Sequence, residues 1–189
     1  MSLAWLPNAI TLARMVMVLP LWWLLARGDY GWALALAALA GFSDALDGVL
    51  AKRFGWQSRL GGLLDPIADK LLLAVAFLSL WWYGGHFPTW LVLLVLCRDV
   101  VILAGAGIWQ LRIAPLEAAP TRLSKANTFF QIVLVLTVLV QLGFGGVPGA
   151  ARDALVYAVA TLTVASGVDY VVCWSRKARQ HVRGGGDER

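Results

Sequence analysis

The sequence is poor in charged residues and in cysteine, and each shortage excludes a class of protein. Only 14% of the 189 residues are charged, whereas 60% are hydrophobic and the mean hydropathy is +0.72. This composition excludes an ordinary soluble domain, and several apolar runs reach the roughly 20 residues needed to cross a bilayer. Cys97 and Cys173 both fall inside apolar runs, so they predict neither a disulfide nor a zinc site. The composition therefore predicts an integral membrane protein.

The net charge of +5 and the pI near 9.6 do not indicate a nucleic-acid partner. The basic residues cluster beside hydrophobic runs, a pattern that fits anionic lipid and membrane topology instead. The chain also lacks an internal repeat and a loop long enough to form a second domain.

The apolar runs predict an all-α integral membrane protein with six transmembrane helices. Five of these runs lie at about residues 8–26, 30–50, 62–83, 88–110 and 151–174, and another follows the polar stretch that begins at Leu123. We expect the membrane domain to span residues 1–174. The basic, glycine-bearing tail, residues 175–189, is predicted to be disordered.

The charges between the runs predict the orientation of the helices. One side of the membrane would carry most of the cations: Lys52, Arg53, Arg59, Arg112, Arg122, Lys125, Arg176, Lys177, Arg179, Arg183 and Arg189. The other side would carry only Arg27 and Arg152. By the positive-inside rule, both termini and the loop after the second run are cytoplasmic.

Four of the nine aspartates flank that loop, at the edges of two apolar runs: Asp44, Asp47, Asp65 and Asp69. Helical residues three or four apart are separated by about 60° or about 40°, so each pair shares one helix face. A short basic linker with glycines would let the two helices run antiparallel, so that the four carboxylates form a polar cup. Carboxylates without His or Cys suit Mg²⁺ or Mn²⁺, and two such ions would clamp a diphosphate. A plainer alternative makes Asp65 a helix cap before Pro66.

Eight positions in this stretch keep every spacing of the pattern D-x2-D-G-x2-A-R-x8-G-x3-D-x3-D: Asp44, Asp47, Gly48, Ala51, Lys52, Gly61, Asp65 and Asp69. In this the chain resembles the CDP-alcohol phosphotransferases, membrane enzymes that build phospholipid head groups. One position departs from the pattern, because the family's Arg is Lys52 here. Lysine lacks the planar fork that grips phosphate bidentately, and the neighbouring Arg53 could substitute for it.

The resemblance implies a role for each of these residues. Asp44, Asp47 and Asp65 would be metal ligands, and Asp69 a ligand and the general base for the acceptor hydroxyl. The CDP-diacylglycerol site would include Gly48, Ala51, Lys52, Arg53, Arg59 and Gly61. Asn8, Thr11 and Arg14 form an N-x-x-T-x-x-R pattern similar to the first helix of phosphatidylglycerolphosphate and cardiolipin synthases, which adds Asn8 and Thr11 to that site. Alternatively, Asn8 caps the helix and Arg14 reaches the membrane interface.

Arg98 and Asp99 stand in the middle of an apolar run, where a charge costs about 2.5–3.5 kcal/mol on insertion scales, so we expect a functional or paired role. Lys70, beside Asp69, is interpreted as an ion-pair partner in preference to a phosphate ligand. The stretch that begins at Ser124 resembles the S-K-x-N-T-x-x-Q pattern of cardiolipin synthases. It is less similar to the G-K-x-K-T pattern of glycerolphosphate-using relatives, in which a second lysine stands at the position of Asn127. We expect Arg98 and Lys125 to bind the phosphate of the acceptor.

The resulting hypothesis is a phosphatidyltransferase of the cell membrane, an inner or plasma membrane, with its active site at the cytoplasmic side. It would move a phosphatidyl group from CDP-diacylglycerol to phosphatidylglycerol, forming cardiolipin and releasing CMP, and the resemblance suggests a homodimer. Glycerol 3-phosphate is the alternative acceptor. An ion or proton transporter is the alternative of another class, since acids within membranes also mark ion paths, but the lack of inverted-repeat symmetry counts against it.

Overall fold

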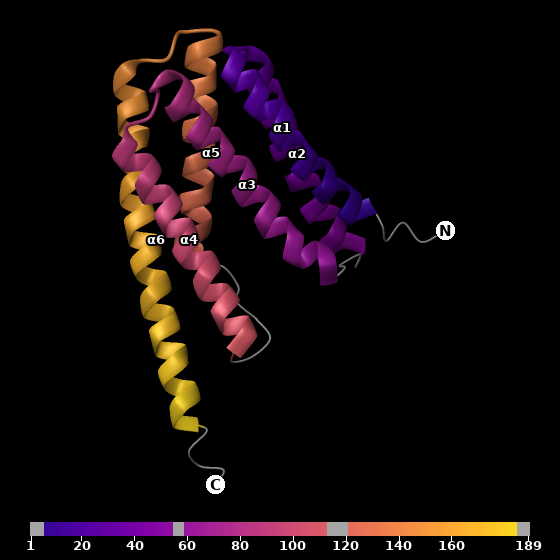
Figure 1. The fold of residues 1–189 in the computed structure, drawn as a ribbon, viewed down its shortest axis with the longest axis vertical. Coiled ribbons are helices and arrows are strands. Elements are labelled where there is room, and N and C mark those ends of the chain that lie inside the picture. The colour runs from indigo at the N-terminus through magenta and orange to yellow at the C-terminus, as the bar shows by residue number, and fades with distance from the viewer. Residues whose placement is uncertain (1–5, 55–58, 113–120, 185–189) are drawn as a thin grey trace.

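The computed structural model describes the backbone of residues 6–54, 59–112 and 121–184, and the side chains of residues 12–43, 70–105, 121–173 and 175. Over these residues the protein consists of six helices without a strand (Figure 1). The helices are α1 (Leu6–Arg27), α2 (Tyr30–Phe54), α3 (Arg59–Gly84), α4 (Thr89–Arg112), α5 (Arg122–Gly143) and α6 (Gly149–Gly184). The predicted all-α class is confirmed, and the described residues form six helices, while six membrane spans stay a prediction.

The basic tail requires a correction, because α6 continues to Gly184. Arg, Lys, Ala and Gln predominate in residues 175–183, and these residues have high helix propensity. The helix that begins in the apolar run therefore extends through them, and the glycines come only at its end. The predicted domain boundary at residue 174 stays a prediction.

Local sequence signals explain where several helices begin and end. Gly28 has a φ of +77° just after α1, and the N–H groups of Gly28 and Asp29 donate to the carbonyls of Leu25 and Leu24, which is a Schellman motif. The Thr121 hydroxyl accepts from the N–H of Ser124 at 3.2 Å and caps α5. The cap at Gly28 makes the connection between α1 and α2 short, so these two helices run in opposite directions.

One end of the bundle collects the segments that the sequence singled out. The start of α1, the end of α2 and the start of α3 lie together at the lower right of Figure 1, and α4 and α6 also end on this lower side. The helix packing supports this arrangement, since α1 contacts both α2 and α3, while α5 contacts α2, α3 and α6. No contact joins α2 to α3 within the described residues, so α1 links the two helices there.

The interior of the bundle combines an apolar core with several polar side chains, and its surface carries many large apolar ones. The buried side chains include polar and charged ones: Arg14, Ser79, Arg98, Asp99, Asn127, Gln131, Thr163 and Ser166. Large apolar side chains face outward in helical rows, such as Leu12, Val16 and Leu19 on α1 and Val164, Val168 and Val171 on α6. In the described part of the chain, two segments are long and apolar enough to cross a membrane, Arg122–Gly143 and Gly149–Cys173.

The opposite end of the bundle joins two of its loops through His86. The Nε2 atom of His86 lies 3.2 Å from the hydroxyl oxygen of Tyr30, which links the α3–α4 connection to the start of α2. Burial, and secondarily the charge of Arg152, lowers the pKa of His86. His86 is therefore neutral near pH 7, and its contact with Tyr30 holds the two connections together.

Candidate functional site

The four aspartates lie on the two helices that the sequence predicts for them. Asp44 and Asp47 lie on α2, and Asp65 and Asp69 lie on α3. Because α3 begins at Arg59, Asp65 is inside this helix, and the interpretation of Asp65 as a helix cap is wrong. Each pair keeps the three- or four-residue spacing that places both members on one face of a helix. The two helix segments that carry the pairs lie at the same end of the bundle (Figure 1).

The other residues of the predicted donor site follow the same backbone. Gly48, Ala51, Lys52 and Arg53 lie in the last turns of α2, Arg59 and Gly61 in the first turn of α3, and Asn8 and Thr11 near the start of α1. The expected basic linker is therefore shorter than predicted, since most of its residues extend the two helices. The side chains of these residues and of the four aspartates lie outside the described ones, so the ligand roles stay predictions.

The chemistry of the available donors fits a divalent cation. Two helix segments at one end of the bundle supply four carboxylates, and carboxylate oxygens are the ligands that Mg²⁺ and Mn²⁺ prefer. The side chains that the structure describes contain no group of three His, Cys, Asp or Glu residues that could hold a metal.

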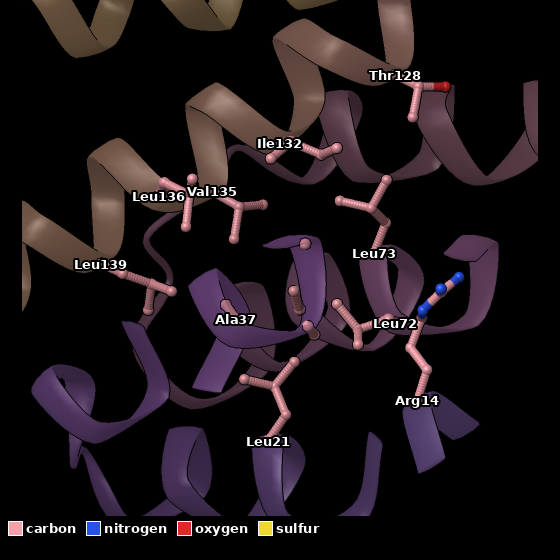
Figure 2. A pocket seen from close by; sticks show the side chains of 13 residues that line it. Arg14, Leu21, Ala37, Leu72, Leu73, Thr128, Ile132, Val135, Leu136 and Leu139 are labelled. Atoms are coloured by element: carbon pink, nitrogen blue, oxygen red, sulfur yellow. The ribbon is translucent and has the colours of Figure 1, made fainter. Parts of the chain in front are cut away.

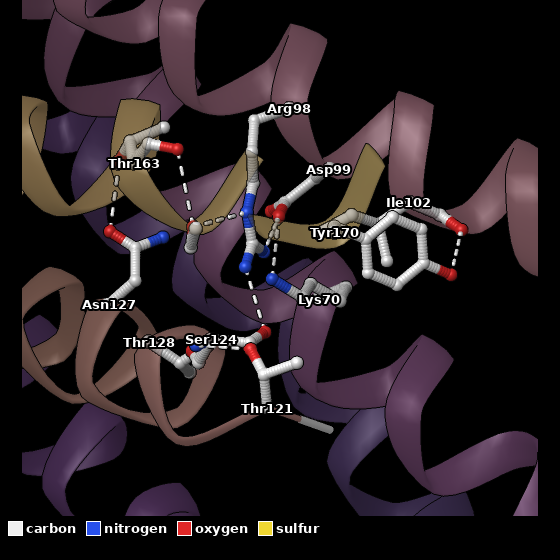
Figure 3. Close-up of polar contacts among 11 residues, drawn as sticks. Lys70, Arg98, Asp99, Ile102, Thr121, Ser124, Asn127, Thr128, Thr163 and Tyr170 are labelled. Atoms are coloured by element: carbon white, nitrogen blue, oxygen red, sulfur yellow. Dashed lines mark hydrogen bonds and ion pairs between the residues drawn. The ribbon is translucent and has the colours of Figure 1, made fainter. Parts of the chain in front are cut away.

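Figure 3 shows an ion cluster that includes Lys70, the residue after Asp69 in the chain. Lys70 on α3 donates from Nζ to Oδ1 of Asp99 at 2.6 Å, and Arg98 on α4 donates from Nη1 to the same oxygen at 2.8 Å. The side chains of Arg98 and Asp99 are only 4% and 11% exposed. The prediction that Lys70 is an ion-pair partner is thus confirmed, and its partner is Asp99. Because Lys70 directly follows Asp69, this pair fixes the part of α3 that carries the predicted base.

Arg98 extends the cluster to two more helices. Its Nη2 donates to the hydroxyl of Ser124 on α5 at 2.8 Å, and its Nε donates to the hydroxyl of Ser166 on α6 at 3.1 Å. Ser166 in turn donates to the backbone carbonyl of Thr163 at 3.2 Å. Each of the three guanidinium nitrogens therefore has a partner in the protein. The cluster joins α3, α4, α5 and α6 through one buried guanidinium.

The two residues expected to bind the acceptor differ in their surroundings. Arg98 is buried and fully engaged, whereas Lys125 is exposed on the first turn of α5. Ser124 lies between them, bonded to Arg98 and next to Lys125 in the chain. Asn127 is fully buried, and its Oδ1 accepts from the Thr163 hydroxyl at 2.9 Å. The acceptor role of Arg98 and Lys125 stays a prediction.

Sequence reasoning missed the contribution of α6 to this cluster. Thr163, Ser166 and Tyr170 line one face of the helix, and the hydroxyl of Tyr170 donates to the backbone carbonyl of Ile102 at 3.2 Å. The signal was present, because polar residues at i, i+3 and i+7 in an apolar run indicate a buried polar stripe.

Replacing Asp99 tests how much the bundle depends on this cluster. Asp99→Asn would leave the buried cation Arg98 and the partly buried cation Lys70 without their shared carboxylate, and breaking a buried ion pair typically costs about 3–5 kcal/mol. We expect the midpoint of thermal unfolding in detergent to fall strongly, and we expect adding Lys70→Gln to recover part of the loss. Asp153→Asn is the matched control, since its pair with Arg152 is exposed and worth about 1 kcal/mol at most. An unchanged midpoint in Asp99→Asn would show that the cluster contributes no stability.

Comparisons with known proteins agree with the motif. The family model of the CDP-alcohol phosphatidyltransferases matches residues 4–169. A cardiolipin synthase (CMP-forming) of Streptomyces coelicolor is 35% identical, over 94% of this chain and 86% of that protein. A probable phosphatidylglycerophosphate synthase of Mycobacterium tuberculosis is 34% identical, over 88% of this chain and 79% of that protein.

Longer relatives contain the matched region as a part. The cardiolipin synthase (CMP-forming) of Rattus norvegicus is 31% identical over 95% of this chain, which spans 64% of the rat protein. Because the family model covers most of the chain, and includes both acid pairs and the ion cluster, the chain belongs to the CDP-alcohol phosphatidyltransferase family.

Proposed function

We propose that the protein transfers a phosphatidyl group from CDP-diacylglycerol to phosphatidylglycerol, forming cardiolipin and releasing CMP. The observation that carries the proposal is the eight-position motif, complete except for Lys52 and placed by α2 and α3 at one end of the bundle. Family membership supports an enzyme and counts against an ion transporter.

The motif residues would perform the transfer as follows. Asp69 takes the proton of the acceptor hydroxyl, and that oxygen attacks the phosphorus atom that carries the diacylglycerol. A new P–O bond forms, the P–O bond to CMP breaks, and CMP leaves with the bond's electron pair. Lys52, Arg53 and Arg59 supply positive charge beside the diphosphate. The ion pair between Lys70 and Asp99 holds the neighbouring Asp69 in register.

The acid segment would also hold the cofactor. Asp44, Asp47, Asp65 and Asp69 would bind two Mg²⁺ or Mn²⁺ ions, which when bound neutralise charge on the attacking and leaving oxygens. The protein itself would position the acceptor hydroxyl beside Asp69 and hold the ends of α2 and α3 that carry the acids close together.

The membrane arrangement is part of the proposal. Outward apolar rows and buried polar residues support a six-span bundle, although only α5 and the first part of α6 pass the length and apolarity criterion within the described residues. The positive-inside rule would then place both termini and the acid end at the cytoplasmic side of the cell membrane, where CMP is released into water. The homodimer stays a prediction from the resemblance.

The polar residues of α4 and α5 favour a lipid acceptor. A phosphomonoester such as glycerol 3-phosphate needs several free cations, whereas phosphatidylglycerol carries one phosphodiester charge. Arg98 is already bonded to Asp99, Ser124 and Ser166, and Asn127 is a neutral residue in a helix-to-helix hydrogen bond. Both acceptor classes occur among the relatives' names, so glycerol 3-phosphate remains the second candidate.

CMP release by the purified protein tests the proposed acceptor. With CDP-diacylglycerol as donor, we expect kcat/KM for phosphatidylglycerol to exceed that for glycerol 3-phosphate by at least about tenfold, or about 1.4 kcal/mol. Lys125→Ala should raise the KM for phosphatidylglycerol more than the KM for the donor. Faster conversion of glycerol 3-phosphate would reverse the assignment, and no CMP release with either acceptor would contradict the proposed function.

Changes to the acids test the cofactor. Asp44→Asn, Asp47→Asn and Asp65→Asn should each abolish CMP release, because removing one anion weakens a site that is held by charge. EDTA should abolish the activity of the unchanged protein, and added Mg²⁺ or Mn²⁺ should restore it. Asp153→Asn is the control and should keep full activity, because Asp153 lies near the start of α6, whereas the motif lies on α2 and α3. Full activity in EDTA, or in any of the three motif variants, would exclude the metal site.

A further inference from the structure

The outward face of α6 is apolar along its membrane-length segment and cationic beyond it. Along this segment, the face carries three valines that stand four residues apart and are 42–58% exposed: Val164, Val168 and Val172. The segment that is apolar enough to cross a membrane ends at Cys173, whereas the helix itself continues to Gly184. The continuation contains four Lys or Arg residues: Arg176, Lys177, Arg179 and Arg183. The valine row therefore leads directly into a basic helix end.

The helix register places three of these cations on the same face as the valine row: Arg176, Arg179 and Arg183. We call these three residues the arginine face. With about 100° of rotation per residue, each of them lies within about 40° of Val172 around the helix axis. Lys177 lies about 140° from Val172 and only about 20° from Tyr170, whose hydroxyl bonds to the backbone of α4. The lysine therefore belongs to the bundle side of the helix, and the arginines belong to its outward side.

The arginine face begins at the depth of lipid head groups. A helix rises about 1.5 Å per residue, so Arg176 stands about 4.5 Å beyond Cys173 and Arg179 about 9 Å beyond it. The head-group layer on each side of a bilayer is roughly 5–7 Å thick, which places Arg176 inside this layer and Arg179 at its outer edge. Arg183, about 15 Å beyond Cys173, is still within about one Debye length, about 8 Å, of the layer. Figure 1 shows that α6 reaches beyond the other helices at this end of the bundle.

From this arrangement we infer that the arginine face binds the phosphates of anionic lipids in the leaflet at the end of the bundle that carries the acid pairs. The inference rests on the membrane arrangement proposed above. A lipid whose chains lie along the valine row has its phosphate beside the arginines, because both groups of residues share one side of one helix. Arginine stays charged at any ordinary pH and donates to phosphate oxygens in pairs of hydrogen bonds. A partner in solution would not account for the continuity of the arginine face with the valine row.

An anionic lipid site at this place has a consequence for the proposed reaction. CDP-diacylglycerol and phosphatidylglycerol both carry negative charge, and cations close to a membrane surface attract such lipids about fivefold per residue. The arginine face would therefore concentrate both substrates at the edge of the bundle, on the side where the acid pairs lie.

Spin-labelled lipids test the inference on the full chain in vesicles of phosphatidylcholine. Electron paramagnetic resonance measures the fraction of label that contact with the protein restricts, for phosphatidic acid and for phosphatidylcholine in separate samples. Phosphatidic acid is anionic but has no alcohol hydroxyl, so it is not an acceptor. We expect the protein to prefer phosphatidic acid about fivefold. In the triple variant Arg176→Gln, Arg179→Gln, Arg183→Gln, this preference should fall below about twofold.

Two further variants separate the arginine face from charge in general. Arg176→Gln alone should lower the preference about twofold, whereas Lys177→Gln, which removes one charge from the bundle side of the same helix turn, is the matched control and should leave it unchanged. Replacing all three arginines by lysine keeps the charge and should retain at least about half of the preference.

Each other outcome contradicts the inference. An unchanged preference in the triple glutamine variant would show that the arginine face serves another partner or none, and an equal loss in Lys177→Gln would show that the position of the charge does not matter. If the unchanged protein restricts neither lipid, the membrane arrangement fails and the inference fails with it. Because the measurement involves no turnover, a protein that shows the expected preferences but releases no CMP would contradict the proposed function alone.

Discussion

The bundle depends on one buried carboxylate, Asp99, which accepts from both Lys70 and Arg98. A charge inside a membrane protein is expensive unless it is paired, so these three residues must assemble together or not at all. Their assembly has a geometric consequence. Lys70 belongs to α3 and follows Asp69, while Arg98 reaches Ser124 on α5 and Ser166 on α6. One ion cluster therefore fixes the helix that carries the second acid pair against the other half of the bundle.

The distribution of polarity links this cluster to the proposed chemistry. Many large apolar residues face outward, as a lipid environment requires, and several polar residues lie inside, where they bond from helix to helix. The helix segments that carry the two acid pairs and the start of α1 lie toward one end of the bundle.

Much of this arrangement could be predicted from the sequence, because long apolar runs and a motif with fixed spacing are local signals. The helices were predicted to within a few residues for this reason, apart from the extension of α6 to Gly184. Pairing between distant residues was harder to predict. Nothing local shows that Lys70 meets Asp99, 29 residues away, or that the guanidinium of Arg98 is fully used by α4, α5 and α6. The apolar cavity that α1, α2, α3 and α5 line (Figure 2) also depends on four helices at once, and a single helical pattern does not reveal such a cavity.

We propose that the two helix segments, with two aspartates each, form one site for two divalent ions. Equilibrium titration of the purified, metal-free protein with Mn²⁺, followed by the electron paramagnetic resonance signal of the free ion, tests this claim without a substrate. The account predicts two tightly bound Mn²⁺ ions per chain, displaced by excess Mg²⁺. A protein that is folded by thermal unfolding, yet leaves all the added Mn²⁺ free in solution, would contradict it.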